Sequence, residues 1–148
     1  MTASSQLENK YTMTQRHLNT LAAIAMVQRC VELTTAQGFN AAATVVDRAG
    51  VVLAVARAND AGAATLDGSR RKAYTAINLG MSSDAAEHLV RDNVSLRALG
   101  DIEQLLPLQG GVLIKIEDRI VGAIGVGGAS GAIDEKTALQ AIEEVLAR

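Results

Sequence analysis

Residues 41–57 have the sequence AAATVVDRAGVVLAVAR, in which two runs of small and β-branched residues flank a short loop with Gly50. This pattern predicts a β-hairpin. Residues 111–126, GVLIKIEDRIVGAIGV, predict a second hairpin that turns at Asp118–Arg119. Because the strands come in hairpin pairs and not in strand–helix–strand alternation, we expect an α+β fold, with helices packed on an antiparallel sheet.

Helical segments precede, separate and follow the two hairpins. We expect them at Gln15–Gln37, at residues 63–79, from residues 82–84 to Val90, and from Ile133 or Asp134 to near Arg148. Thr14 is the expected N-cap of the first helix, which places His17 in its first turn. Gly38 and Gly80 suit the left-handed conformation that ends a helix. A short strand is also expected at Leu105–Leu108, at an edge of the sheet because the segment contains a proline.

Composition limits the size and the partners of the protein. The 148 residues are enough for one domain with a core of its own. The first 13 residues are polar, so we expect a flexible segment over residues 1–13 and one domain over residues 14–148. A net charge of −2, one Phe and two Tyr disfavour nucleic-acid binding. The sequence contains no signal-peptide pattern and no apolar run long enough for a membrane span, so we expect a cytoplasmic protein.

Small residues dominate the apolar part of the composition. Alanine is abundant, there are 13 glycines, and aromatic residues make up only 2% of the chain. A core of small side chains buries little apolar area per residue. We therefore expect the chain to gain stability by self-association, as a homo-oligomer.

Three stretches contain candidate binding residues, each with a structural alternative. Gly125–Gly131 follows the last strand and could bind a phosphate or carboxylate through backbone N–H groups, or could simply connect strand and helix. Gly110–Gly111 could admit a flat ligand or another backbone segment. Arg70–Lys72, followed by Tyr74, could bind an acidic group or could be solvated charges on a helix.

The remaining reactive side chains form no recognisable catalytic arrangement. His17 and His88 lack a second ligand at helical spacing, so neither predicts a zinc pair, although a lone histidine can be an axial haem ligand. Cys30 lies among apolar neighbours, which predicts an inert buried thiol. The carboxylates are scattered, and no Ser-His-Asp set can be named.

Three motifs in order resemble one protein family. Thr44–Leu53 resembles its V-V-D-x-x-G-x-L hairpin, and Arg57–Ala61 with Arg71–Ala76 resembles its R-x-D-x-A and K-A-x-T-A segments. Gln109–Ile114 with Val121–Gly128 resembles its G-G-x-P-I and G-A-I-G-V-S-G signature. The family is that of GlcG and HbpS, which includes the C-terminal domain of PduO-type proteins. The resemblance implies a profilin-like sandwich with a five-stranded antiparallel sheet, and assembly into dimers or larger rings.

The resemblance also implies a first hypothesis for function, the binding of haem or a related tetrapyrrole. His17 is the candidate axial iron ligand, because a PduO-type haem ligand lies in the same N-terminal helix region. Arg71 or Lys72 would pair with a propionate. Gly110–Gly111 would make room for the ring, and Tyr74 would contribute an apolar body with a polar tip.

Two other hypotheses stay open. In the second, the protein is an enzyme or enzyme accessory that acts on a small carboxylate or aldehyde. Arg57, Lys72 and the loop from Gly127 through Gly128 to Gly131 would hold the anion, with Asp60 as acid or base. In the third, the protein is a structural or assembly partner without a ligand of its own.

Overall fold

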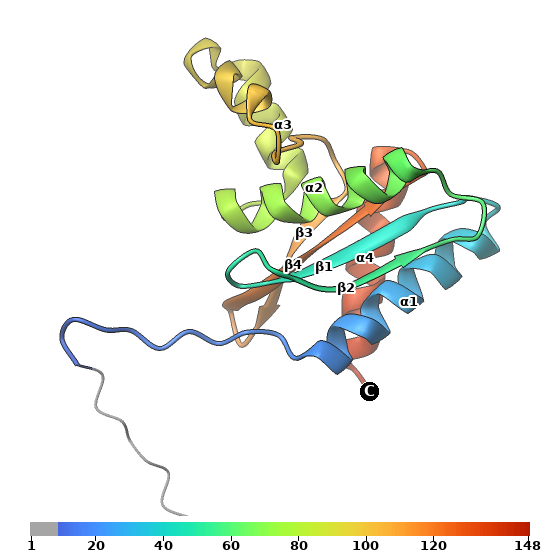
Figure 1. Cartoon of the computed structure of the whole chain (residues 1–148), viewed down its shortest axis with the longest axis horizontal. Coiled ribbons are helices and arrows are strands. Elements are labelled where there is room, and N and C mark those ends of the chain that lie inside the picture. The colour runs from blue at the N-terminus through green and yellow to red at the C-terminus, as the bar shows by residue number, and fades with distance from the viewer. Residues whose placement is uncertain (1–8) are drawn as a thin grey trace, which may run out of the picture.

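The computed structural model describes residues 9–148 of the chain (Figure 1). The expected flexible segment at residues 1–13 falls mostly outside the described residues. The elements are α1 (Thr20–Ala36), β1 (Ala42–Asp47), β2 (Val52–Arg57), α2 (Ala63–Leu79), α3 (Ser83–Asp92), the 3₁₀ helix η1 (Val94–Asp101), β3 (Gly111–Ile116), β4 (Arg119–Gly127) and α4 (Gly131–Leu146).

The four strands form one antiparallel sheet in the order β2-β1-β4-β3. Both expected hairpins, β1–β2 and β3–β4, are therefore confirmed. The pairing register shifts between Val45 and Val46 in the first hairpin and between Ile114 and Lys115 in the second, as at β-bulges. β4 lies inside the sheet, between β1 and β3, which explains why both of its faces are apolar.

The expectation of a fifth strand at Leu105–Leu108 was wrong, because these residues form a loop against α2. The Arg71 guanidinium donates to the Leu105 carbonyl at 2.9 Å, and the Leu106 N–H donates to Thr75 Oγ1 at 2.7 Å. Backbone groups that are satisfied by side chains do not need a neighbouring strand. The sheet formed by residues 9–148 therefore has four strands.

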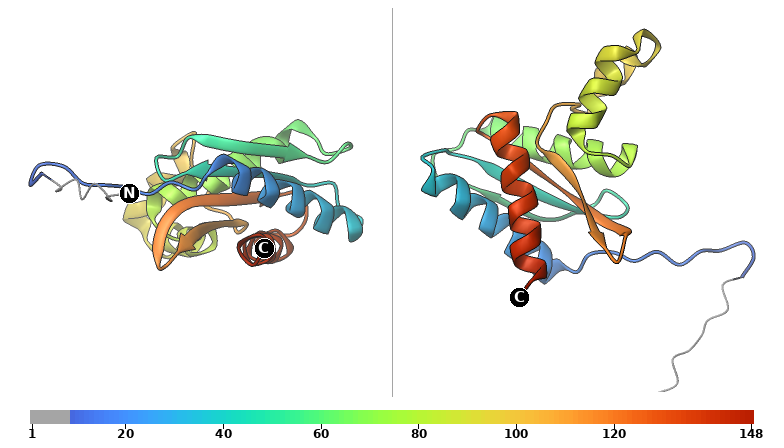
Figure 2. Two further views of the ribbon diagram at one scale, coloured as in Figure 1. Left: turned by 90° about the horizontal axis from the view of Figure 1, so that it is seen from below. Right: turned by 180° about the vertical axis from the view of Figure 1, so that it is seen from behind.

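Helices cover both faces of the sheet (Figure 2). α2 packs on one face, across β4, β1 and β3, while α1 and α4 pack on the other face and against each other. The larger core, on the side of α1 and α4, includes Met26, Cys30, Val45, Ile114, Ile124 and Val126. The smaller core, on the side of α2, consists of Val46, Ala73, Ala76, Ile77 and Ala123.

Two glycines bring the backbone of α2 into direct contact with the sheet. A Cβ on Gly125 would collide with the carbonyl oxygen of Ser69 and would lie 2.6 Å from the nitrogen of Ala73. A Cβ on Gly111 would collide with the carbonyl oxygen of Lys72. Glycine at these positions permits a helix-to-strand approach that no other residue allows. We call this contact the glycine seam.

The first helix begins later than expected. Its N-cap is Asn19 and not Thr14, since Asn19 Oδ1 accepts the N–H of Ala22 at 2.8 Å. The N–H of Leu18 donates to β4 at 3.0 Å, which holds the preceding backbone against the sheet. His17 therefore lies before the helix and not in its first turn, which corrects that expectation.

The other helices lie close to their expected positions. α2 covers the expected residues 63–79 and ends at Gly80, which has a φ of 67°. Gly38, just after α1, has a φ of 85°. α4 begins at Gly131, two or three residues before the expected start, and is capped by Ser130. α3 and η1 project away from the sheet beyond α2 (Figure 1).

Candidate functional site

A buried ion pair joins α2 to α4 at the end of β4. Lys72 Nζ donates to Asp134 Oδ2 at 3.1 Å and to the carbonyl oxygen of Val126 at 3.0 Å. The two charged side chains are 10% and 2% exposed. The other carboxylate oxygen of Asp134 accepts the N–H of Ala129 at 3.1 Å. Buried charges that are paired and hydrogen-bonded in this way are fixed in position.

Burial of Asp134 has an electrostatic consequence. Loss of solvation raises the pKa of its carboxyl group above the ordinary value, while the Lys72 ammonium and the Ala129 N–H act in the opposite direction. The carboxylate form is therefore held by its two partners against an unfavourable environment. Any change that removes Lys72 leaves this balance without its main favourable contribution.

A cavity of about 370 Å³ opens beside the pair. It is lined by Lys72, Glu87, Leu108, Gln109, Ala129, Gly131 and Asp134. We call it the Lys72 cavity. Glu87 Oε2 accepts the backbone N–H of Gln109 at 3.2 Å, and the Gln109 side-chain amide donates to Glu135 at 2.6 Å. The walls thus come from α2, α3, α4 and the loop before β3.

Gly110 and Gly111 are packed against β4 and against Lys72 of α2. A Cβ on Gly110 would lie 2.7 Å from the Val126 oxygen and 2.8 Å from Lys72 Nζ. The N–H of Gly111 donates to Ser83 Oγ at 2.7 Å. The volume that a side chain would take at these positions is therefore already filled by protein atoms.

The other residues of the expected anion site lie in a different hollow. Arg57 and Asp60 line a space of about 220 Å³ together with Val31, Thr35, Asn40, Ala58 and Asn59. The Arg57 guanidinium donates to the carbonyl oxygens of Ala58, Asn59 and Ala61, so it closes the turn after β2. The structure therefore does not bring Arg57 and Asp60 together with Lys72.

Gly127 and Gly128 connect β4 to the start of α4. A Cβ on Gly127 would lie 3.2 Å from the Thr65 oxygen, and one on Gly128 would lie 2.5 Å from the Asn40 oxygen. Gly128 also has a φ of 123°, which favours glycine. Tight packing and backbone conformation account for glycine at both positions.

Arg71 and Tyr74 point away from the Lys72 cavity. Arg71 binds the loop at Leu105, and its buried Nε has no hydrogen-bond partner among the described residues. The Tyr74 ring lies over the turn of the β1–β2 hairpin, where a Cβ on Gly50 would be 3.6 Å from it. Neither side chain shares a hollow with Lys72.

His17 lies near the opposite end of β4. Its Nδ1 is 3.8 Å from Asp47 Oδ2, and its side chain is 41% exposed. Asp47 in turn accepts the N–H groups of Ala49 and Val51, which fixes the carboxylate at the hairpin turn. A carboxylate beside one ring nitrogen leaves the other nitrogen to face a ligand, an arrangement typical of metal-binding histidines.

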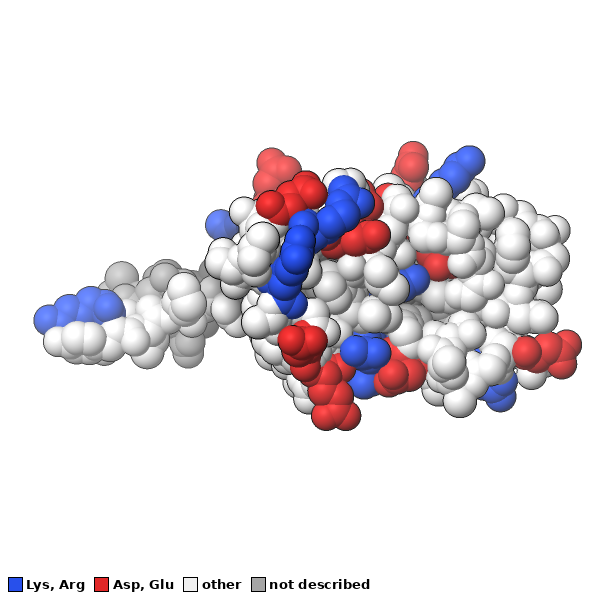
Figure 3. All heavy atoms as spheres, turned by 90° about the horizontal axis from the view of Figure 1, so that it is seen from above, with Lys and Arg blue, Asp and Glu red and all other residues white. Residues whose placement is uncertain are grey.

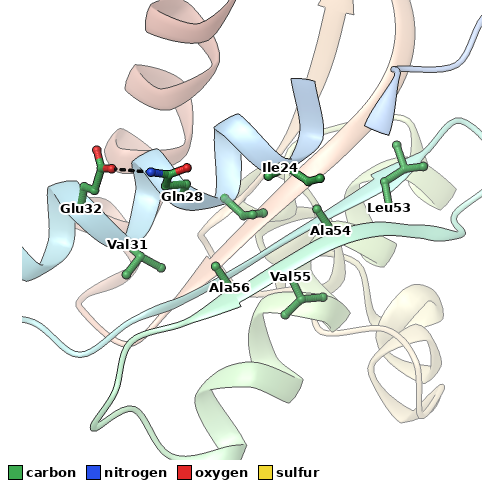
Figure 4. Close-up of a pocket in the computed structure, with 9 residues that line it drawn as sticks. Ile24, Gln28, Val31, Glu32, Leu53, Ala54, Val55 and Ala56 are labelled. Carbon is green, nitrogen blue, oxygen red and sulfur yellow. Dashed lines mark hydrogen bonds between the residues drawn. The ribbon is translucent and has the colours of Figure 1, made fainter. Parts of the chain in front are cut away.

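An apolar groove of about 370 Å³ runs between α1 and the edge strand β2 (Figure 4). It is lined by Ile24, Val27, Gln28, Val31, Glu32 and residues 53–56. The polar members are joined to each other, since Gln28 donates to Glu32 at 3.0 Å. Exposed apolar side chains continue this surface along α1, where Leu21 is 79% and Ile24 46% exposed. The groove is thus a surface that a partner or an apolar ligand could cover.

Charge and metal ligands give no further candidate. Lys, Arg, Asp and Glu are interspersed on the face in Figure 3, without a patch of one sign. In residues 9–148, no cluster of three or more His, Cys, Asp or Glu side chains is arranged to hold a metal ion. Across the same residues, every helix is too short or too polar to span a membrane.

Asp134 and Glu87 were not predicted from the sequence as residues of a site. Asp134 was one of the scattered carboxylates and a possible start of the last helix, while Glu87 was not singled out. One signal was available, because an acidic residue in the first turn of a helix follows directly after a glycine-rich loop. The approach of Glu87 depends on how α3 packs on α2, which no local pattern encodes.

The fold and these sites define a small α+β domain, with a single antiparallel sheet flanked by helices and a buried ion pair at one end. Residues 18–143 match the family model described as haem degrading protein HbpS-like. The chain belongs to the HbpS-like family. No curated protein gives a significant match.

Solved structures agree with this assignment. A double mutant of HbpS from Streptomyces reticuli is 31% identical, with a TM-score of 0.81, and the match covers 94% of this chain and 93% of that one. The protein ORFY of Klebsiella pneumoniae is 25% identical, with a TM-score of 0.87 and coverage of 96% and 99%. The complex of PduOC with heme is 20% identical, with a TM-score of 0.75 and coverage of 86% and 94%, a similarity of fold alone.

Proposed function

We propose that this chain is a ligand-binding protein of the cytoplasm that works as a homo-oligomer and binds haem or a related tetrapyrrole. The observation that carries the proposal is the His17–Asp47 pair. Its imidazole is partly exposed, with Nδ1 3.8 Å from a carboxylate. Membership of the HbpS-like family and the heme complex of a protein with the same fold add support.

His17 is suited to coordinate haem iron as an axial ligand, but the residues around it do not form a closed haem pocket. The other ring nitrogen, Nε2, would be the atom that coordinates the haem iron. The apolar groove begins on α1, the helix that directly follows His17, and offers the apolar surface that a tetrapyrrole ring requires. Arg71 and Lys72 bind other parts of the chain, so any cation that pairs with a propionate would come from elsewhere.

A haemin titration followed by absorbance tests the proposal, with His17→Ala beside the wild-type protein. His88→Ala is the matched control, because His88 is the only other histidine and also lies beside an aspartate, Asp84, at 3.6 Å. We expect a saturable shift of the Soret band in the wild-type protein and the control, and at least about tenfold weaker binding in His17→Ala. An unchanged His17→Ala titration would move the ligand elsewhere, and no saturable band would remove haem.

The homo-oligomer rests on a second observation. Alanines are frequent in both cores, while Leu21, Val52 and Val55 are exposed on α1 and β2. An edge strand with apolar neighbours is a ready surface for association. Analytical ultracentrifugation tests it: we expect an assembly larger than one chain, and a Val55→Lys variant that shifts it toward the monomer. A wild-type monomer would contradict it.

The alternative of an enzyme acting on a small carboxylate or aldehyde has less support. Arg57 is occupied by three carbonyl groups of its own turn, and Lys72 is already paired with Asp134. A cation that already pairs with a carboxylate attracts a second anion less strongly than a free cation does. Thermal-shift screens with small carboxylates, compared between the wild-type protein and Arg57→Gln, would test the hollow that contains Asp60.

A further inference from the structure

The Lys72 cavity and His17 lie at opposite ends of β4. His17 precedes Leu18, whose N–H binds Val121 near the start of β4, while Lys72 binds the carbonyl of Val126 near the strand's end. These two strand positions are five residues apart, about 17 Å along the strand. A ligand of the Lys72 cavity would therefore be separate from a haem at His17, and each can be tested without the other.

Two polar groups in the wall of the cavity have unused hydrogen-bonding capacity. The Lys72 ammonium has three N–H donors, of which the contacts to Val126 and Asp134 use two. Glu87 receives one N–H, from Gln109, on one of its two carboxylate oxygens. Within the described residues, no further partner satisfies either group. The cavity thus presents one donor and one acceptor to whatever enters it.

The balance of charge excludes one class of ligand. Glu87 and Asp134 line the cavity, and Glu135 lies directly behind Gln109, so three carboxylates stand around the single ammonium of Lys72. The positive charge of Lys72 is already neutralised by Asp134 at 3.1 Å. A carboxylate ligand would add a fourth negative charge in a partly desolvated space, which is unfavourable.

We propose that the Lys72 cavity binds a small uncharged molecule with several hydroxyl groups, in preference to a carboxylate. A hydroxyl group can accept from Lys72 and donate to Glu87 at once, which matches the open donor and acceptor. A neighbouring hydroxyl can bind the Gln109 amide, whose oxygen lies near Gly131. Leu108, which is 47% exposed, lies in the wall and leaves a route from solvent.

The test uses two probes, xylitol and xylonate, that differ only at one end. Xylonate has a carboxylate in place of one terminal CH₂OH group of xylitol. Binding is followed by backbone and side-chain amide shifts in NMR spectra of the full chain. We expect xylitol to shift Gln109 and Ala129 saturably, in the millimolar range, and to bind at least about fivefold more tightly than xylonate. Tighter binding of xylonate, or no binding of xylitol, would overturn the proposal.

Glu87→Gln gives the sharper experiment and is expected to fold. The glutamine oxygen can still accept the N–H of Gln109, while the open carboxylate oxygen becomes an NH₂ donor and one negative charge is lost. We expect most of the preference for xylitol to be lost, because xylonate should bind at least about fivefold more tightly than it does to the wild-type protein. Glu143→Gln, an exposed position on α4 outside the cavity, is the matched control and should change neither affinity. An unchanged preference in Glu87→Gln would refute the role given to charge.

Discussion

The two ends of β4 hold charged groups in opposite ways. At one end, Lys72 and Asp134 are nearly inaccessible, and each binds backbone as well as its partner. At the other, His17 and Asp47 are 3.8 Å apart and partly open to solvent. The first pair joins two helices and a strand, while the second joins an N-terminal extension to a hairpin turn.

The difference in burial gives the two pairs different roles: the buried pair matters for folding, and the exposed pair can change its partners. A buried pair loses much of its solvation, so its geometry must remain close to ideal. An exposed pair contributes little to folding and can change partners at small cost. We therefore expect substitutions at the Lys72 end to lower the free energy of unfolding. Substitutions at the His17 end should instead change the affinity for a ligand.

The largest expected effect comes from Lys72→Met, which leaves the Asp134 carboxylate buried without its cation. Removal of one partner of a buried pair costs about 3–5 kcal/mol in the free energy of unfolding. Urea denaturation measures this loss. The double variant Lys72→Met with Asp134→Asn, which removes both charges and keeps an acceptor for Ala129, should recover most of it. A double variant no more stable than the single one would show that packing, and not the charge, is responsible.

The next effect concerns the glycine seam, which sets the position of Lys72. Gly125→Ala places a methyl group against the Ser69 carbonyl, so α2 must shift, at a cost of about 1–3 kcal/mol. Gly68→Ala is the control on the same helix, because its Cβ would meet only Leu106, at 3.9 Å. The control should be stabilised by about 0.5–1 kcal/mol, since alanine is the better helix former. Equal effects of the two substitutions in thermal unfolding would contradict a tight seam.

A surface pair provides a smaller, pH-dependent comparison. Arg29 on α1 contacts Glu144 on α4 and lowers the pKa of that carboxyl group below its ordinary value of 4.5. A depressed pKa in the folded state stabilises the protein above the unfolded value, and this contribution is lost as the pH falls through the folded value. Wild-type protein should therefore be more stable than Arg29→Gln at neutral pH, and the difference should shrink as the pH falls below 4.5 and through the lowered pKa of the folded state. A difference independent of pH in urea denaturation would attribute the effect to packing.

The smallest change in stability is expected at the His17 end. Asp47→Asn keeps an oxygen for the N–H groups of Ala49 and Val51, so unfolding should change by about 0–1 kcal/mol. If His17 is an axial ligand, loss of the neighbouring charge should still weaken haemin binding by about tenfold or more. Haemin titration and thermal unfolding of the same variant separate the two effects. If Asp47→Asn destabilised the protein as much as Lys72→Met does, the two ends of β4 would not differ in the way proposed.

The sequence predicted those parts of the fold that local patterns encode. Both hairpins and the limits of α2 follow from β-branched runs and from Gly80, and the structure confirms them. The fifth strand failed because Leu105–Leu108 finds its hydrogen-bond partners on α2, a long-range contact. The start of α1 failed because Asn19 competes with Thr14 as a cap, and packing against β4 decides between them.

The candidate site was harder to predict, for a physical reason. Lys72, Glu87 and Asp134 lie on three different helices, so only tertiary packing brings them to one cavity. The glycines at 110 and 111 were expected to admit a ligand, but their surroundings are filled by β4 and by Lys72 of α2. Glycine permits close approach without indicating what approaches.

The glycine seam has a consequence for how this protein can change over generations. Main-chain atoms of α2 contact main-chain atoms of the sheet directly. The distance between the helix and the sheet therefore does not depend on which side chains fill the two cores. Exchanges among Ala, Val and Ile in those cores would alter how firmly the protein folds, yet leave Lys72 at the same place above Val126. The geometry at the end of β4 is thereby insulated from sequence drift in the interior, provided that the seam glycines are retained.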